Sequence, residues 1–230
     1  SGGLVSRRQD PELANEIDLA KRHGQLIAVL PGIYAAAEIA SHWQTRARAA
    51  CLWDADAVII GDAAAALSFR RGMRPRIVEV ATRRRKLTRT GMRFVERTIP
   101  PELVLDVSGV RVSCPDLTAI DLAPHTGGNS IDDALRSRMS TLDGMYRALQ
   151  MGRRGNAARR RYLLDSRGEP WSSGEREAHR ALRAGGVTRW RANVRIVCGG
   201  ATYFQDIAFD GSPLVAEIDG VDHLRPERFA

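Results

Sequence analysis

The sequence has 230 residues, of which 43% are hydrophobic and 27% charged, a composition typical of folded proteins rather than of disordered chains. No stretch approaches the roughly 18 apolar residues of a membrane span, and Ser1–Gly3 lacks the features of a signal peptide, so we expect a cytoplasmic protein without a membrane partner. The formal net charge of +8 favours a polyanionic partner.

The first 150 residues predict alternating helices and strands. A short amphipathic helix is expected over 11–22, its start set by Asp10 before Pro11, and a hairpin over 25–34 with its turn at Pro31-Gly32. A helix followed by a hairpin indicates the remnant of a winged helix. Further predictions follow in chain order: helices over 35–53 and 55–67, strands over 76–81, 92–98 and 110–113, and helices beginning at 115 and 130.

The segment 151–171 predicts an arginine-rich linker, because glycine and proline interrupt any regular pattern there. A helix is expected over 172–184, stopped by Gly185-Gly186. Three strands should follow, over 191–198, 203–209 and 214–218, with the first two joined through Gly199-Gly200. The C-terminal part therefore predicts a helix followed by a three-stranded sheet.

Most of the excess positive charge is local. Twelve arginines but only four acidic residues lie between Arg153 and Arg195, a pattern that favours phosphate contacts; an arginine-rich solvated surface is the alternative. A second basic group follows the strand predicted over 76–81, where phosphate contact and a solvated loop are both open. The predicted DNA-contacting residues are Arg83, Arg84, Arg85, Lys86, Arg153, Arg154, Arg159, Arg160 and Arg161.

Three carboxylates fall on the last two predicted strands. Asp206 lies in one strand, Glu217 in the next, and Asp219 two positions later on the same pleat face. Carboxylates on neighbouring strands can hold Mg²⁺ (or Mn²⁺), which would activate water against a phosphodiester. The alternative is that these residues only end strands and turns.

The residues Gln205-Asp206-Ile207-Ala208-Phe209 and the run from Leu214 to His223 resemble the small nucleases related to very-short-patch-repair endonucleases, which have a restriction-endonuclease-like fold. The Ser172–Glu175 segment is similar to the opening helix of that family. The resemblance implies that Glu175, Asp206 and Glu217 form the metal-binding and catalytic set, with Asp206 and Glu217 as metal ligands. It also implies that Asp219 and His223 assist catalysis.

Two departures from the nuclease pattern are visible. Asp219 stands where restriction-like folds often have lysine, and the family continues beyond the histidine whereas this sequence ends at Ala230. The resemblance therefore implies a nuclease-like domain that is incomplete at its C-terminus.

Residues 20 to 140 resemble the AbiEi-antitoxin-type proteins that commonly precede such nuclease domains in actinobacteria. The resemblance is carried by Gly32-Ile33-Tyr34, by Gly61–Leu67 and by the run from Val112 to Ala123. It implies a DNA-binding winged helix, with the hairpin over 25–34 as its wing, followed by an α+β part over 35–150.

The sequence thus predicts an α+β protein with an antitoxin-like region over 1–150, a linker over 151–171 and a small α/β endonuclease-like domain over 172–230. Its predicted function is that of a DNA-binding, metal-dependent endonuclease. A non-enzymatic antitoxin-type transcriptional regulator with a degenerate nuclease domain is the main alternative, and an interaction protein with a structural acidic cluster is a third. A homodimer and a toxin or defence-system partner are left open.

Overall fold

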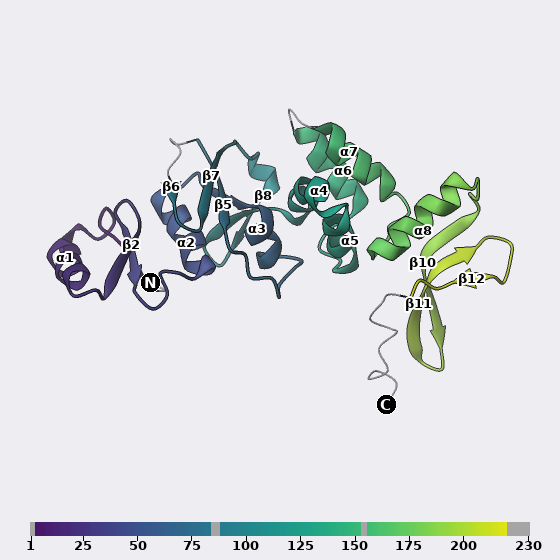
Figure 1. Ribbon diagram of the computed structural model, residues 1–230, viewed down its shortest axis with the longest axis horizontal. Helices are drawn as coiled ribbons and strands as arrows, with labels where there is room; N and C mark the ends of the chain where they lie inside the picture. The colour runs from purple at the N-terminus through teal and green to yellow at the C-terminus, as the bar shows by residue number, and fades with distance from the viewer. Residues whose placement is uncertain (1–2, 84–87, 153–155, 220–230) are drawn as a thin grey trace. The chain divides into compact units, whose positions relative to one another are not determined.

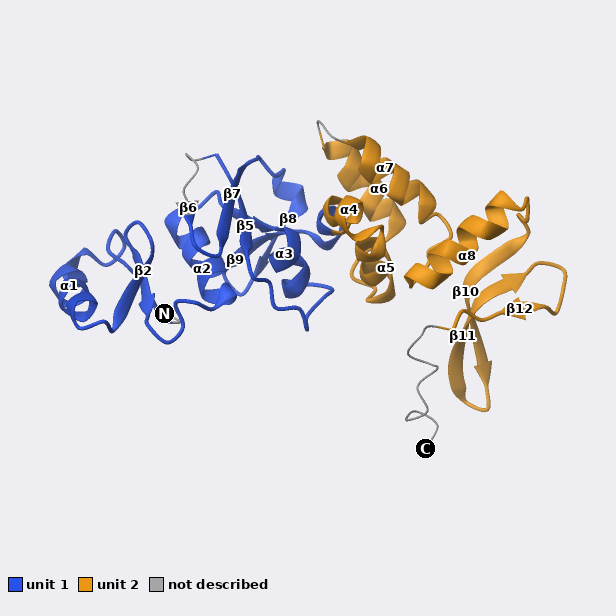
Figure 2. Cartoon of the chain, in the orientation of Figure 1, with its two compact units in different colours: residues 1–118 blue, residues 119–230 orange. Residues whose placement is uncertain are grey.

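A computed structural model describes residues 3–83, 88–152 and 156–219 (Figure 1). The chain is α+β and forms two compact units, Ser1–Thr118 and Ala119–Ala230, coloured separately in Figure 2. Within the described residues, no helix is both long and apolar enough to cross a lipid bilayer.

The first unit begins with a small three-stranded antiparallel sheet of order β1-β3-β2. Its elements are β1 (Leu4–Ser6), a 3₁₀ turn (Pro11–Leu13), α1 (Ala14–Arg22), β2 (Leu26–Leu30) and β3 (Ile33–Ala36). The predicted helix and hairpin are confirmed, with a left-handed glycine, Gly32 (φ 77°), in the turn where a residue with a Cβ would be strained. The strand β1, which the sequence analysis did not predict, pairs with β3.

A six-stranded mixed sheet forms the rest of this unit, in the order β6-β7-β5-β4-β9-β8. Its strands are β4 (Val58–Ile60), β5 (Val78–Thr82), β6 (Thr88–Arg89), β7 (Met92–Glu96), β8 (Val104–Val107) and β9 (Val110–Ser113). The helices α2 (Trp43–Trp53) and α3 (Gly61–Leu67) contribute buried alanines to its core. A short 3₁₀ turn, Pro101–Leu103, precedes β8.

The prediction of one helix over 55–67 was wrong in its first part. Val58, Ile59 and Ile60 form the central strand β4, which pairs with β5 on one side and β9 on the other. All three side chains are buried, as expected of a strand covered on both faces, and such a short apolar run has no period that separates helix from strand.

The second unit opens with helices around a buried ion pair. Its helices are α4 (Pro115–Thr126, whose first turn belongs to the first unit), α5 (Asn129–Arg136), α6 (Leu142–Met151), α7 (Asn156–Asp165) and α8 (Ser173–Ala184). Arg176 of α8 and Asp132 of α5 are 2% and 1% exposed, and Arg176 Nε donates to Asp132 Oδ2 at 3.1 Å. Arg176 Nη2 also donates to Ser166 Oγ at 2.8 Å. Burial raises the pKa of Asp132 to about 6, against the opposing effect of Arg176.

A three-stranded antiparallel sheet of order β10-β11-β12 completes this unit. Its strands are β10 (Trp190–Cys198), β11 (Ala201–Phe209) and β12 (Val215–Ala216). The predicted hairpin at Gly199-Gly200 is confirmed, and both glycines have positive φ angles, 58° and 81°, as a tight two-residue turn requires. The predicted order of a helix followed by three strands is therefore present.

The two compact units meet in the sequence at Thr118 and Ala119, whereas the sequence predicted a boundary within 151–171. Part of that predicted linker forms the helix α7, which the sequence analysis did not predict. Ion pairs join α7 and α8 to the preceding helices, so no linker separates them. Arg159 Nη2 of α7 lies 2.9 Å from Asp121 Oδ1 of α4, and Arg176 of α8 pairs with Asp132 of α5.

Candidate functional site

Glu175 connects the start of α8 to the strand β10. Ser172 caps the helix, its Oγ accepting from the Glu175 backbone N–H at 3.1 Å. Glu175 is 6% exposed, and its Oε2 accepts from the backbone N–H of Trp171 at 2.9 Å and from Nδ2 of Asn193 at 3.3 Å. The side chain that the nuclease resemblance assigned to catalysis is thus held inside the protein by polar contacts.

Asn193 occupies an irregular position in β10. Its φ angle is 51°, in the left-handed region that asparagine tolerates better than most residues. Its Nδ2 donates to the carbonyl oxygen of Glu169 at 2.8 Å as well as to Glu175. Its Oδ1 is buried and has no hydrogen-bond partner among the described residues, although buried polar atoms are normally bonded.

The strand register aligns Asn193 with two of the predicted carboxylates. Ala192 pairs with Ile207 and Val194 with Gln205, so Asn193 lies opposite Asp206. On the other side of β11, Ile207 pairs with Ala216, the last residue of β12, and Glu217 follows directly after that pair. We call Asn193, Asp206 and Glu217 the polar row, which Glu175 adjoins.

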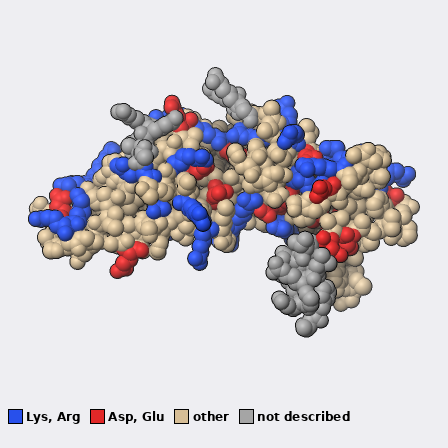
Figure 3. All heavy atoms as spheres, in the orientation of Figure 1, with Lys and Arg blue, Asp and Glu red and all other residues tan. Residues whose placement is uncertain are grey.

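Asp206 also hydrogen-bonds to the segment that follows β12. It is half-buried, and its Oδ2 accepts from the backbone N–H of Ile218 at 2.7 Å. Glu217 and Asp219, on either side of Ile218, are exposed. Acidic side chains are visible on this C-terminal sheet in Figure 3. Asp206 lies in β11 as expected, whereas Glu217 directly follows β12, which ends at Ala216.

The atoms of the polar row that could coordinate a metal ion are oxygens, the ligands that Mg²⁺ and Mn²⁺ prefer. Within residues 3–83, 88–152 and 156–219, however, no group of three or more His, Cys, Asp or Glu side chains is arranged to hold a metal ion. Glu175 reaches the row through Asn193 rather than as part of such a group. The donors that suit a hard cation are the carboxylates of Asp206 and Glu217 and the Oδ1 of Asn193, which no described residue bonds.

Asn193 is the member of the row that sequence reasoning missed. The signal was available, because a two-residue turn at Gly199-Gly200 pairs Cys198 with Ala201 and so fixes Asn193 opposite Asp206. His223 lies outside the described residues, so its predicted role stays a prediction.

The predicted basic residues differ in how much of their charge is already paired. Arg159 is ion-paired with Asp121 at 2.9 Å and is largely buried. Arg160 and Arg161 are exposed, and the Arg161 guanidinium lies 5.0 Å from the Tyr162 ring centroid. Figure 3 shows Lys and Arg side chains, with some acidic ones among them, over this helical part. Arg84, Arg85, Lys86, Arg153 and Arg154 lie outside the described residues.

Arg83 belongs to a second basic surface, on the first unit. Its Nε donates to Thr98 Oγ1 at 3.1 Å, and it lines a small cavity of about 150 Å³ with Arg97 and Arg111. Asp56 lines the same cavity, so its charge is mixed.

The helix and hairpin at the start of the first unit present a further polar surface. Asn15, Lys21 and Arg22 on α1 are exposed, while Ile17 packs inward. The Lys21 Nζ lies 5.0 Å from the centroid of the Tyr34 ring of β3, which joins helix and hairpin. This arrangement, a helix directly before a hairpin, is the one that the sequence predicted for a winged-helix remnant.

No family model matches the chain, and a search of curated proteins finds no match.

Proposed function

We propose that this chain is a DNA-binding protein whose α8–β10–β11–β12 part hydrolyses phosphodiester bonds with the help of Mg²⁺ or Mn²⁺. The observation that carries the proposal is the polar row. The Asp206 carboxylate on β11, the Glu217 carboxylate directly after β12, and a buried Asn193 amide oxygen that has no partner among the described residues lie on neighbouring segments, next to a buried glutamate. A purely structural row would be expected to satisfy Asn193 Oδ1 within the protein.

Asp206, Glu217 and Asn193 would hold the cation through their oxygens, and a bound cation would supply charge stabilisation and an activated water for attack on phosphorus. Glu175 has a positioning role, because it fixes the Asn193 amide by accepting from Nδ2. With Nδ2 turned toward Glu169 and Glu175, Oδ1 is the atom of Asn193 left for a ligand. Asp219 and His223 remain proposed helpers.

Arginine-rich surfaces would hold the DNA. Arg160, Arg161 and Arg195 are exposed in the same unit as the polar row and would contact phosphates without reading bases. Arg180 is also exposed but is ion-paired with Asp165. Such contacts release counterions, so binding should weaken steeply with salt.

A second candidate function is that of a non-enzymatic DNA-binding regulator. One observation favours it: α1 directly precedes the β2–β3 hairpin and exposes Asn15, Lys21 and Arg22. In helix-turn-helix proteins the recognition helix enters the major groove, and α1 would have that role here. In this reading the polar row would be a scaffold only.

Nicking of supercoiled plasmid with Mg²⁺ or Mn²⁺, with EDTA as the metal-free control, tests the proposal. We expect the wild-type chain to nick and Glu217→Gln to lose at least about a hundredfold in rate, because a charged oxygen is lost from the row. Glu177→Gln is the matched control, since Glu177 is exposed on α8 outside the row. A wild-type chain that binds plasmid at low salt without cutting it in either metal would instead establish the regulator.

A further inference from the structure

A cavity separate from the polar row lies between the end of α7, the end of α8 and the start of β10. Its volume is about 470 Å³, which falls in the range of small-molecule sites, roughly 300–1,000 Å³. The lining includes three guanidinium groups and a single carboxylate, from Arg167, Arg183, Arg191 and Glu169. The cavity is therefore large enough for more than a bare ion and is predominantly basic.

Two of these guanidinium groups have no carboxylate partner among the described residues. Arg167 Nη1 donates to the carbonyl of Leu164 at 2.8 Å, and Arg183 Nη1 to the carbonyl of Asp165 at 3.4 Å. Arg191, in contrast, is paired with Asp210 at 2.9 Å. Burial and the nearby charge of Arg167 lower the pKa of Arg183, yet a guanidinium stays protonated at neutral pH. Arg167 and Arg183 thus bring two like charges to one cavity, where Glu169 is the only carboxylate among the described lining residues.

The wall of the cavity holds Arg183 in position. The Arg183 guanidinium carbon lies 5.3 Å from the Trp190 ring centroid. Gly168 faces the same place: a Cβ on it would lie 2.7 Å from Arg183 Nη2, 3.0 Å from His179 Nδ1 and 3.0 Å from Trp190 Cη2. Only glycine leaves these three side chains where they are.

A buried histidine, His179, lies behind the Gly168 part of the wall. It is 0% exposed, and both of its ring nitrogens are without a hydrogen-bond partner among the described residues. Its Nδ1 faces Gly168, in the cavity wall, and its ring lies against Trp190 at a centroid distance of 4.5 Å. His179 does not itself line the cavity, but buried polar groups are normally bonded, so polar atoms directly behind Gly168 are left unsatisfied by the described residues.

We propose that the cavity lined by Arg167, Gly168, Arg183 and Trp190 binds the phosphate of a nucleotide, either free or within a nucleic-acid strand. Arginine is suited to this role because its planar fork donates two parallel hydrogen bonds to phosphate oxygens. The cavity volume leaves room for the attached sugar and base. The site shares no residue with the polar row, so it does not depend on the proposed hydrolysis.

The test is a binding measurement in EDTA, which keeps the polar row free of divalent metal. Isothermal titration with dAMP, and fluorescence anisotropy with a labelled single-stranded oligonucleotide, distinguish the free from the strand-bound nucleotide. Deoxyadenosine, which lacks the phosphate, is the ligand control. We expect dAMP or the oligonucleotide to bind. Deoxyadenosine should bind at least about tenfold more weakly, because it lacks the charge-assisted contacts to phosphate.

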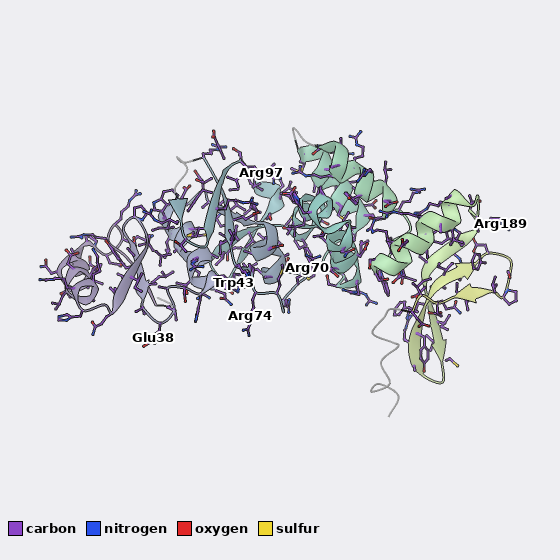
Figure 4. All side chains as sticks on the ribbon, viewed as in Figure 1. Glu38, Trp43, Arg70, Arg74, Arg97 and Arg189 are labelled. Atoms are coloured by element: carbon purple, nitrogen blue, oxygen red, sulfur yellow. The ribbon has the colours of Figure 1, made fainter. Side chains whose placement is uncertain are left out.

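Arg167→Gln and Arg183→Gln should each weaken binding about tenfold. The charge-matched control is Arg189→Gln, because Arg189 projects from the α8–β10 connection (Figure 4) and does not line the cavity. Gly168→Ala leaves the charge unchanged and should also weaken binding by displacing Arg183, and circular dichroism will verify that each variant is folded.

Equal affinity of Arg167→Gln, Gly168→Ala and Arg189→Gln for both probes would overturn the assignment, as would equal binding of deoxyadenosine and dAMP. Glu217→Gln separates the two proposals. It should bind dAMP like wild type even where plasmid nicking is lost, and failure of nicking in every variant would leave the cavity result standing.

Discussion

Asn193 lies opposite Asp206 across the β10–β11 pair, and its φ angle of 51° breaks the regular strand at that point. The irregular backbone carries the Asn193 amide nitrogen to Glu169 and Glu175, and it leaves Oδ1 buried without a partner among the described residues. Left-handed backbone at a non-glycine residue costs roughly 1 kcal/mol or more and is frequent at functional sites. Asn193 is therefore the residue on which the polar row is best tested.

Replacement of Asn193 should separate its backbone role from its side-chain role. Asn193→Ala loses two hydrogen bonds and strains the left-handed backbone, so we expect a loss of about 2–3 kcal/mol in the free energy of unfolding. Asn193→Gly loses the same bonds without the strain and should be about 1 kcal/mol more stable than Asn193→Ala. Urea denaturation measures both. Equal stability of the two variants would show that the backbone at position 193 is not strained.

The paired and unpaired arginines of α7 should differ in their effect on DNA binding. The slope of log K against log salt is negative. Arg160→Gln or Arg161→Gln should reduce its magnitude by about 1, because each removes one phosphate contact. Arg159→Gln should leave the slope nearly unchanged, since Asp121 already neutralises Arg159. Anisotropy of a labelled duplex over a salt series gives the three slopes. Three equal changes would show that the ion pair with Asp121 opens on DNA.

Removal of Arg176 should destabilise the second unit strongly. Arg176→Met leaves the buried Asp132 carboxyl without its charged partner, and we expect a loss of about 3–5 kcal/mol in the free energy of unfolding. The double variant Arg176→Met/Asp132→Leu should recover part of that loss, because no buried charge remains. Chemical denaturation of both single variants and the double variant completes the cycle. Losses that simply add would argue against coupling between the two side chains.

His179 should make the protein sensitive to acid. Burial, with the charges of Arg183 and Arg176, lowers the pKa of His179 to about 4 from 6.5. The unfolded chain then binds more protons at this residue than the folded chain between pH 4 and 6.5, so its contribution to stability is complete above pH 6.5 and is lost as pH falls through that window. The full effect is on the order of 3 kcal/mol.

Asp132 acts in the opposite sense, because its pKa is raised to about 6 and the folded state binds its proton more tightly. The contribution of His179 is therefore read from the difference between wild type and His179→Phe, in which the effect of Asp132 cancels. We expect the variant to lose less stability than wild type between pH 6.5 and 4.5, as measured by urea denaturation at each pH. Parallel stability curves for the two proteins would contradict a buried neutral imidazole.

The sequence by itself determined the local elements at the C-terminus and the chemistry that they carry. Ser172 and Glu175 fix the start of α8, Gly199-Gly200 fixes the β10–β11 hairpin, and the spacing of Asp206 and Glu217 puts them on β11 and directly after β12. These features depend on capping, turn geometry and a period of two, which act over a few residues.

Only the tertiary structure decided the features that depend on distant partners. Val58–Ile60 is a strand because β5 and β9 flank it, α7 is a helix packed through Arg159 and Asp121, and Glu175 is buried because Asn193 meets it from another element. The cavity of Arg167 and Arg183 likewise requires α7, α8 and β10 together. Burial and long-range pairing set these outcomes, and neither is encoded in a short window of sequence.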